Sequence, residues 1–124
     1  MEKTKRIIHH YQPECFIIAG VDLAHVGLKF GHSLPGEALL AEARIHDEKL
    51  VAALSQGDPQ KFWQINQEVE DRYNVCGFSP LIILMHILPG LKGKLLDYYF
   101  WIDSASLSAV SFAALAFFEG QEIN

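Results

Sequence analysis

Two residues that can bind a metal or transfer a proton follow an apolar run near the start of the chain. Asp22 and His25 lie three residues apart, directly after residues 15–20 (CFIIAG). Such a run between turn signals is typical of a parallel strand buried on both faces, and ligands bind beyond the carboxyl ends of these strands. His25 would supply a neutral nitrogen, and Asp22 would orient its other ring nitrogen. The structural alternative is that Asp22 caps a turn and His25 packs in the core.

A second candidate, Cys76, comes a few residues before a predicted helix start at Ser79 and Pro80. The partial positive charge at a helix N-terminus favours thiolate, the form that binds metal or attacks an electrophile. The alternative is a small buried hydrophobic side chain.

Asp47 interrupts the apolar stripe of another predicted helix, so its carboxylate needs a hydrogen-bonding partner. We interpret Asp47 as structural, with support of the site as the alternative.

Length and composition limit the classes of protein. The chain has 124 residues, of which 50% are hydrophobic and 20% charged, with a net charge of −5. These values predict one globular domain over residues 1–124. The acidic balance argues against nucleic-acid binding, and no apolar run reaches the roughly 20 residues of a membrane span. Two cysteines make no disulfide framework, and no secretory signal opens the chain, so we expect a cytoplasmic protein.

The periodicity of apolar residues and the turn signals predict an α/β fold. It has a parallel-strand core, a C-terminal β-hairpin that turns near Asp103, and flanking helices. The helix after Pro80 is apolar nearly all round, which predicts that it is buried and that His86 lies in the core. In chain order, the predicted helices cover residues 2–11, 37–54, 59–73 and 81–88, and the predicted strands cover residues 15–20, 95–101 and 107–118.

The segment around the first candidate site resembles a known family. Residues 19–27 (AGVDLAHVG), continued by residues 29–31 (KFG), resemble a motif of the Memo-like proteins, and most closely the group named AmmeMemoRadiSam system protein B. The resemblance covers nearly the whole chain, because further segments agree in the same order. These are residues 57–58 (GD), residues 75–77 (VCG) with Pro80, residues 96–98 (LDY) with Trp101, and residues 108–114 (SAVSFAA).

The resemblance implies a fold similar to the class III extradiol dioxygenases, which use non-haem iron. It also implies a pocket built from first-half histidines and a second-half histidine and cysteine, which His25 and Cys76 match, with Asp22 as the aspartate of the same loop. Asp22 and His25 are therefore the predicted catalytic residues, and His25 and Cys76 the predicted metal ligands. Imidazole and thiolate suit iron, copper or zinc. The resemblance further implies redox activity and a functional link to a radical-SAM protein.

The resemblance also implies that this chain corresponds to the C-terminal half of the family's domain, since family members are more than twice as long. The first-half histidines have no counterpart, and two ligands are fewer than the three or four of a stable site. We therefore expect a partial Memo-like domain that forms a homo-oligomer or pairs with a complementary N-terminal half. Its predicted function is to contribute to a metal-dependent, redox or dioxygenase-like site. The alternatives are a non-catalytic module that binds a peptide or small ligand, and an inactive truncated remnant.

Overall fold

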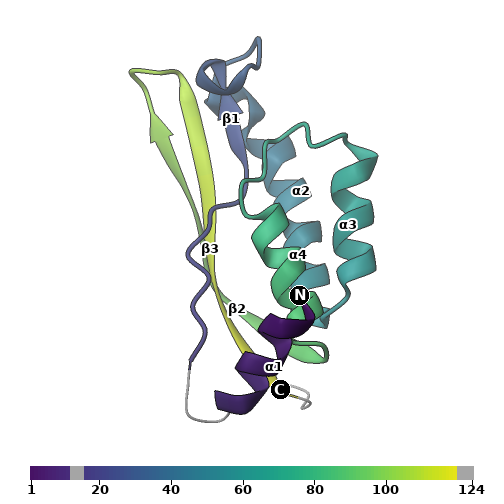
Figure 1. The fold of residues 1–124 in the computed structure, drawn as a ribbon. Coiled ribbons are helices and arrows are strands. Elements are labelled where there is room, and N and C mark those ends of the chain that lie inside the picture. Colours follow the sequence, from purple (N-terminus) through teal and green to yellow (C-terminus); the bar gives the residue numbers. More distant parts are fainter. Residues whose placement is uncertain (12–15, 120–124) are drawn as a thin grey trace.

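A three-stranded antiparallel sheet forms one layer of the molecule. The computed structural model describes residues 1–11 and 16–119. The strands β1 (His25–Gly27), β2 (Leu91–Asp103) and β3 (Ser108–Glu119) lie in the order β1-β3-β2, and both pairings are antiparallel. The long hairpin of β2 and β3 confirms the predicted one; β2 is longer than predicted, and β3 is shifted by one residue from its predicted range (Figure 1).

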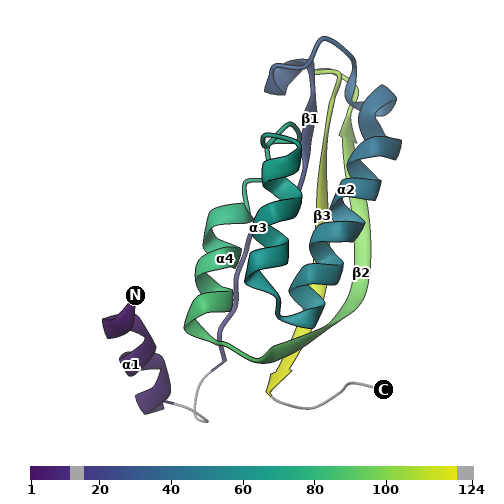
Figure 2. The same ribbon diagram turned by 90° about the vertical axis from the view of Figure 1, so that its right-hand side faces the viewer.

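Helices cover one face of this sheet, and within residues 1–11 and 16–119 nothing covers the other face. The helices are α1 (Glu2–Tyr11), α2 (Gly36–Gln56), α3 (Pro59–Glu68) and α4 (Phe78–Ile87), with a short 3-10 helix η1 (Leu28–Phe30) after β1. Two views at right angles show α2, α3 and α4 together on the same side of the hairpin (Figures 1 and 2). The mixed helix and strand content confirms the α/β prediction at that level.

Local signals in the sequence fix the ends of the helices. Gly57 ends α2 in the left-handed conformation with φ 69°, and Asp58 then caps α3 by accepting a hydrogen bond from the Lys61 N–H at 2.9 Å. The prediction that α3 reaches Tyr73 is wrong. Glu70 and Asp71 both adopt positive φ, which ends the helix at Glu68 and starts an irregular loop.

The hydrophobic core lies between the helices and the sheet. Its largest fully buried apolar side chains are Leu50, Phe62 and Val26, which come from α2, α3 and β1. Phe62 also stacks on Phe78 of α4 with ring centroids 5.3 Å apart. The core therefore joins α2, α3 and α4 to the short strand that carries His25.

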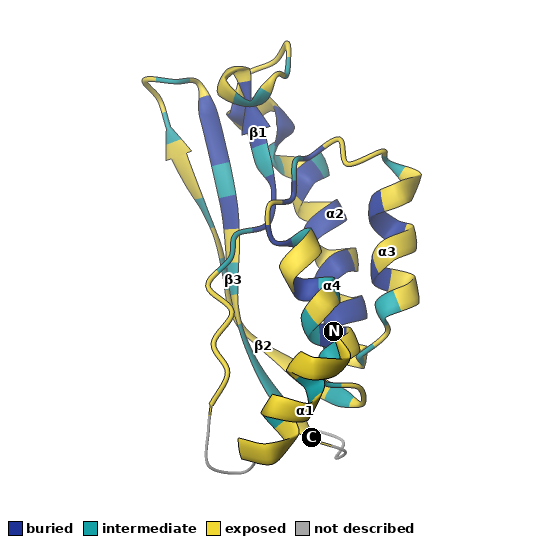
Figure 3. Ribbon diagram, in the orientation of Figure 1, coloured by how far each residue is buried: buried dark blue, intermediate teal, exposed yellow. Residues whose placement is uncertain are grey.

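The buried parallel strand predicted at residues 15–20 is not found. Cys15 lies outside the described residues, and residues 16–20 form an exposed irregular segment that leads into β1 (Figure 3). Phe16 is 100% and Ile18 91% exposed. Both strand pairings in the described part of the chain are antiparallel, so the parallel-strand core is not confirmed. An apolar run becomes a buried strand only where neighbouring strands cover it, and among the described residues the backbone hydrogen bonds from this segment to β3 begin at Leu23.

The apolar helix α4 is covered on one side only. Leu81 and Met85 are buried, whereas Ile83 is 44% exposed and His86 lies at the surface. The predictions of a fully buried helix and of a core histidine are therefore wrong. No helix within the described residues is both long and apolar enough to cross a membrane.

Candidate metal centre

The structure brings Asp22, His25 and Cys76 together from two distant segments. One ligand atom from each side chain lies within 4.8 Å of the others, and none of the three residues is buried. The prediction that these residues cluster is therefore confirmed. Carboxylate oxygen, imidazole nitrogen and thiolate sulfur together form a set that binds transition metals.

Backbone hydrogen bonds hold the two segments against each other. The Gly77 N–H donates to the Asp22 carbonyl at 2.9 Å, and the His25 N–H donates to the Tyr73 carbonyl at 2.7 Å. The Asn74 side chain donates to the carbonyls of His25 and Phe30 at 3.1 and 3.2 Å. The relative position of Asp22, His25 and Cys76 is thus set by the main chain as well as by side-chain packing.

The ring of His25 is oriented by a backbone carbonyl. Its Nδ1 lies 3.1 Å from the Leu23 carbonyl oxygen, which can only accept, so Nδ1 is the donor and Nε2 is the nitrogen that a neutral ring would offer to a metal. The ring also contacts Phe30 edge-on, with centroids 5.0 Å apart. Asp22 therefore does not play the predicted orienting role, which falls to Leu23. A backbone carbonyl on one nitrogen is a common arrangement for a histidine that binds metal through the other.

Cys76 lies on the surface, just before α4. Its Sγ is 3.5 Å from the Asp22 carbonyl oxygen, and Phe78, the first residue of α4, follows two positions later. The prediction that Cys76 precedes a helix start is confirmed, and the alternative of a buried hydrophobic side chain is wrong because Cys76 is exposed. The sulfur is therefore accessible to both a metal ion and a reagent in solution.

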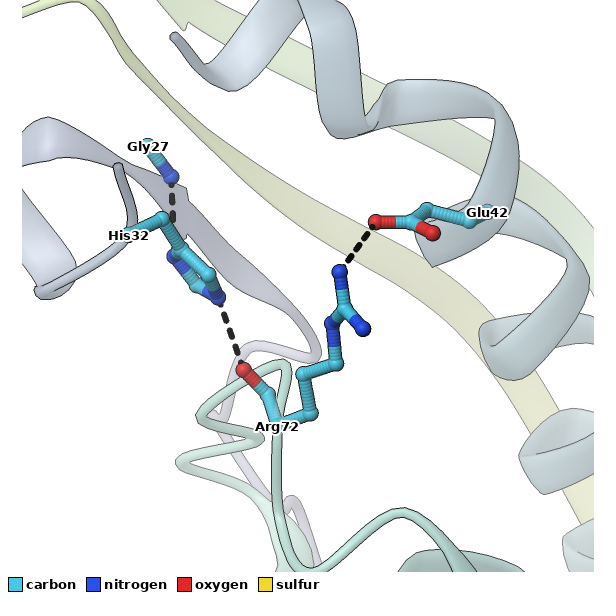
Figure 4. A network of polar contacts seen from close by, with 4 residues as sticks. All are labelled: Gly27, His32, Glu42 and Arg72. Carbon is cyan, nitrogen blue, oxygen red and sulfur yellow. Dashed lines mark hydrogen bonds and ion pairs between the residues drawn. The ribbon is translucent and has the colours of Figure 1, made fainter. Parts of the chain in front are cut away.

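His32 links the loop that follows β1 to the loop that precedes Cys76. The Gly27 N–H donates to His32 Nδ1 at 3.2 Å, which leaves the proton on Nε2, and Nε2 donates to the Arg72 carbonyl at 2.8 Å. The Arg72 guanidinium continues to Glu42 of α2 at 3.1 Å, across an exposed ion pair (Figure 4). The sequence marked neither His32 nor Asn74 as part of the site, because their partners are backbone groups and all but Gly27 are distant along the chain.

Asp47 is buried beneath the loop that carries Asp22 and His25. Its Oδ2 accepts hydrogen bonds from the Tyr98 hydroxyl at 2.6 Å and from the Ser111 hydroxyl at 2.5 Å. Burial raises the pKa of Asp47 above its ordinary value, although both hydrogen bonds oppose that shift. Burial, together with the bond to Asp47, also raises the pKa of the Tyr98 hydroxyl. Oδ2 of the Asp47 carboxylate therefore has the hydrogen bonds that its burial requires, whereas Oδ1 is buried without a hydrogen-bond partner among the described residues.

His46, the residue of α2 just before Asp47, is buried beneath the loop that leads to Cys76. Its Nε2 lies 3.3 Å from the Asn66 Oδ1, and its ring packs against Tyr73 with centroids 4.9 Å apart. Burial lowers the pKa of His46 below its ordinary value of 6.5, although the bond to Asn66 opposes this. His46 was not among the residues predicted from the sequence. The signal that could have found it is its place beside Asp47, on the buried side of α2.

The arrangement can do the chemistry of an open metal site. Three ligands of mixed type would leave coordination positions for water or a substrate, as in catalytic rather than structural zinc sites. Metal bonds of about 2.0–2.3 Å require the three side chains to draw closer than they lie here, by small rotations about their own bonds. The residues present therefore fit a transition-metal ion.

Comparisons with known proteins agree with the motifs. A family model described as Memo-like protein matches residues 2–116. A MEMO1 family protein of Aquifex aeolicus is 29% identical over 107 residues, which are 82% of this chain and 27% of the relative. A MEMO1 family protein of Thermus thermophilus is 29% identical over 99 residues, which are 80% of this chain and 30% of the relative.

The match to the family model extends across the fold and across the candidate metal centre. The family model covers Asp22, His25 and Cys76 and ends within β3. The chain itself spans less than a third of the length of the two relatives. Since the family model accounts for most of the sequence, this chain belongs to the Memo-like family.

Proposed function

We propose that Asp22, His25 and Cys76 bind a transition-metal ion, and that this site serves a metal-dependent reaction of the redox or dioxygenase-like type. The observation that carries the proposal is the convergence of three different ligand atoms within 4.8 Å from segments about fifty residues apart. Iron, copper and zinc all suit imidazole and thiolate ligands. A bound ion would act as a Lewis acid or, if it is iron or copper, activate dioxygen.

Each residue has a defined part in this proposal. His25 offers Nε2, because its Nδ1 proton is held by the Leu23 carbonyl. Cys76 offers its sulfur after loss of the thiol proton, which metal binding favours. Asp22 supplies the third ligand or accepts a proton from a bound substrate, since its carboxylate is not committed to the His25 ring. The substrate must approach from the surface, where the three side chains are accessible.

Metal binding by the purified chain tests the proposal. Equilibrium dialysis against Zn²⁺ or Co²⁺, and against Fe²⁺ without oxygen, should give at most one ion per chain with a thiolate-to-cobalt charge-transfer band for Co²⁺. His25→Ala and Cys76→Ala should each weaken binding and Cys76→Ala should remove the band. His86→Ala is the matched control, because His86 is an exposed histidine on α4 away from the three ligands. Equal metal binding by the parent protein and by the His25→Ala, Cys76→Ala and His86→Ala variants would refute the site.

The length of the relatives suggests that further polypeptide completes the functional unit. We propose that the bare face of the hairpin and the groove beside residues 16–20 pack against chain of the kind that makes up the rest of the relatives. On the bare face Tyr99 is 62% and Trp101 57% exposed. The groove is apolar, with a volume of about 710 Å³, and Phe16, Leu84 and Leu115 line it. Apolar surfaces of this extent are typical of interfaces.

A further inference from the structure

Two neighbouring residues of α2 each begin a chain of hydrogen bonds that ends at the candidate metal site. One chain ends at the loop that carries Asp22 and His25, and the other ends at the loop that leads to Cys76. His46 and Asp47 are 4% and 0% exposed. The Asp47 carboxylate faces β2 and β3, whereas the His46 ring faces α3 and the loop after it. Burial of such groups is costly unless they are hydrogen-bonded. Consecutive residues of a helix point about 100° apart, so the two side chains diverge toward different parts of the structure.

The chain from Asp47 ends beside His25. Asp47 Oδ2 accepts the proton of the Ser111 hydroxyl at 2.5 Å, which fixes the direction of that O–H bond. The Ser111 oxygen is then free to accept the Ala24 N–H at 2.8 Å. Backbone bonds from the Leu23 N–H to the Ser111 carbonyl and from the Ser111 N–H to the Ala24 carbonyl complete the contact. The peptide groups between Asp22 and His25 are thereby anchored to a buried carboxylate.

The chain from His46 ends beside Cys76. His46 Nε2 donates to Asn66 Oδ1 at 3.3 Å, and Asn66 Nδ2 donates to Asp71 Oδ1 at 3.2 Å. The same oxygen of Asp71 accepts the Val75 N–H at 3.2 Å. Asp71 reaches these partners from a left-handed backbone conformation with φ 53°. Such a conformation is costly for a residue other than glycine, and it persists only where surrounding contacts hold it.

From these contacts we infer that His46 and Asp47 are positioning residues of the proposed metal site. Asp47 sets the loop of Asp22 and His25 through Ser111, and His46 sets the loop of Cys76 through Asn66 and Asp71. Because both chains start from adjacent residues of one rigid helix, α2 fixes the separation of the ligands before any metal arrives. This inference rests on the proposed function for its purpose, while its contacts stand independently of it.

Tyr98 provides a matched control for the Asp47 chain. Its hydroxyl donates to the same Oδ2 atom at 2.6 Å, yet Tyr98 is not a link in the path from Asp47 through Ser111 to Ala24. Tyr98→Phe therefore removes a buried hydrogen bond to Asp47 and leaves the link to the loop in place. His46→Gln serves the other chain, because glutamine keeps an N–H donor toward Asn66, whereas His46→Leu removes it.

The experiment measures Co²⁺ affinity by the thiolate-to-cobalt absorption band and amide hydrogen exchange by NMR. Ser111→Ala and His46→Leu should each bind Co²⁺ about 10–100-fold more weakly, as expected for groups that orient ligands. The Ala24 amide should exchange faster in Ser111→Ala, and the Val75 amide faster in Asn66→Ala. Tyr98→Phe and His46→Gln should keep the affinity of the parent protein even where they lower its melting temperature.

The outcomes separate this inference from the proposed function. If the parent binds Co²⁺ and Ser111→Ala and His46→Leu bind it equally well, the positioning role is wrong. If the parent gives no thiolate-to-cobalt band, the metal site is wrong, and positioning is judged by exchange of the Ala24 and Val75 amides alone. If the Ala24 amide in Ser111→Ala and the Val75 amide in Asn66→Ala exchange as slowly as in the parent protein, the positioning role is wrong. Should Ser111→Ala fail to fold, Asn66→Ala and His46→Leu decide the result.

Discussion

Gly77 and Asp22 are in direct backbone contact, although they lie on segments far apart along the chain. The Gly77 N–H donates to the Asp22 carbonyl at 2.9 Å. A Cβ atom at position 77 would lie 2.5 Å from that carbonyl oxygen and 2.9 Å from Val21 Cγ2. Only glycine permits this approach, and the approach brings Cys76 within reach of Asp22 and His25.

Gly77→Ala should separate the two loops. The added methyl group cannot fit without movement of the Asp22 backbone, so we expect a loss of about 1–3 kcal/mol in the free energy of unfolding, measured by urea denaturation. Metal affinity should fall as well, because the ligands move apart. Gly90→Ala is the comparison for crowding, since nothing lies within 4 Å of a Cβ there, although its φ of 83° adds backbone strain. A stable Gly77→Ala protein with unchanged metal affinity would contradict the prediction.

Cys76 should react readily with a thiol reagent, and zinc should protect it. In a Cys15→Ser background Cys76 is the single thiol of the chain, and its side chain is exposed. We expect modification by 5,5′-dithiobis(2-nitrobenzoate) in the folded protein, and slower modification when Zn²⁺ is present, because a coordinated sulfur is a poor nucleophile toward the reagent. In the His25→Ala variant the protection by Zn²⁺ should be lost. Protection that persists without His25 would place the ion elsewhere.

Burial of neutral His46 should make stability depend on pH. The pKa of His46 lies below 6.5 in the folded protein, so the unfolded chain takes up the proton first as the pH falls. Stability from neutral His46 is therefore complete above pH 6.5 and is lost as the pH falls from 6.5 toward the folded-state pKa. Lys49 strengthens the shift, and Asp71 and the bond to Asn66 oppose it.

The measurement is the free energy of unfolding across this pH range. His46→Gln should flatten the fall in stability below pH 6.5, because glutamine does not titrate. His86→Gln should leave it unchanged, since His86 is exposed. The raised pKa of Asp47 acts in the opposite direction, with its contribution lost as the pH rises above 3.8. A slope that survives in His46→Gln would assign the effect to another group.

The bare apolar surfaces predict that the isolated chain associates. Leu96 and Tyr99 of β2 are each 62% exposed, and Phe118 of β3 is 50% exposed. Light scattering of the pure chain at micromolar concentration should therefore show a mass above 13.9 kDa. Tyr99→Lys together with Trp101→Lys should lower that mass, whereas Glu37→Lys on α2 should not. A monomer that unfolds cooperatively would show that the chain needs no further polypeptide.

The sequence by itself determined the elements whose signals are local. Asp58 with Pro59 fixed the start of α3, Gly57 fixed the end of α2, and the turn after Asp103 fixed the hairpin, because each signal acts within a few residues. The motif around Asp22 and His25 also identified the family, which the comparison over residues 2–116 confirms.

Only the tertiary structure decided what depends on distant partners. Residues 16–20 are as apolar as a buried strand, yet they are exposed, because burial requires neighbouring strands rather than composition. In the same way, the orientation of His25 by the Leu23 carbonyl and the anchoring of its loop by Ser111 and Asp47 arise from contacts across the fold. Hydrogen bonds to backbone groups leave no residue pattern in a single sequence, so the support of the site appeared only when the chain was folded.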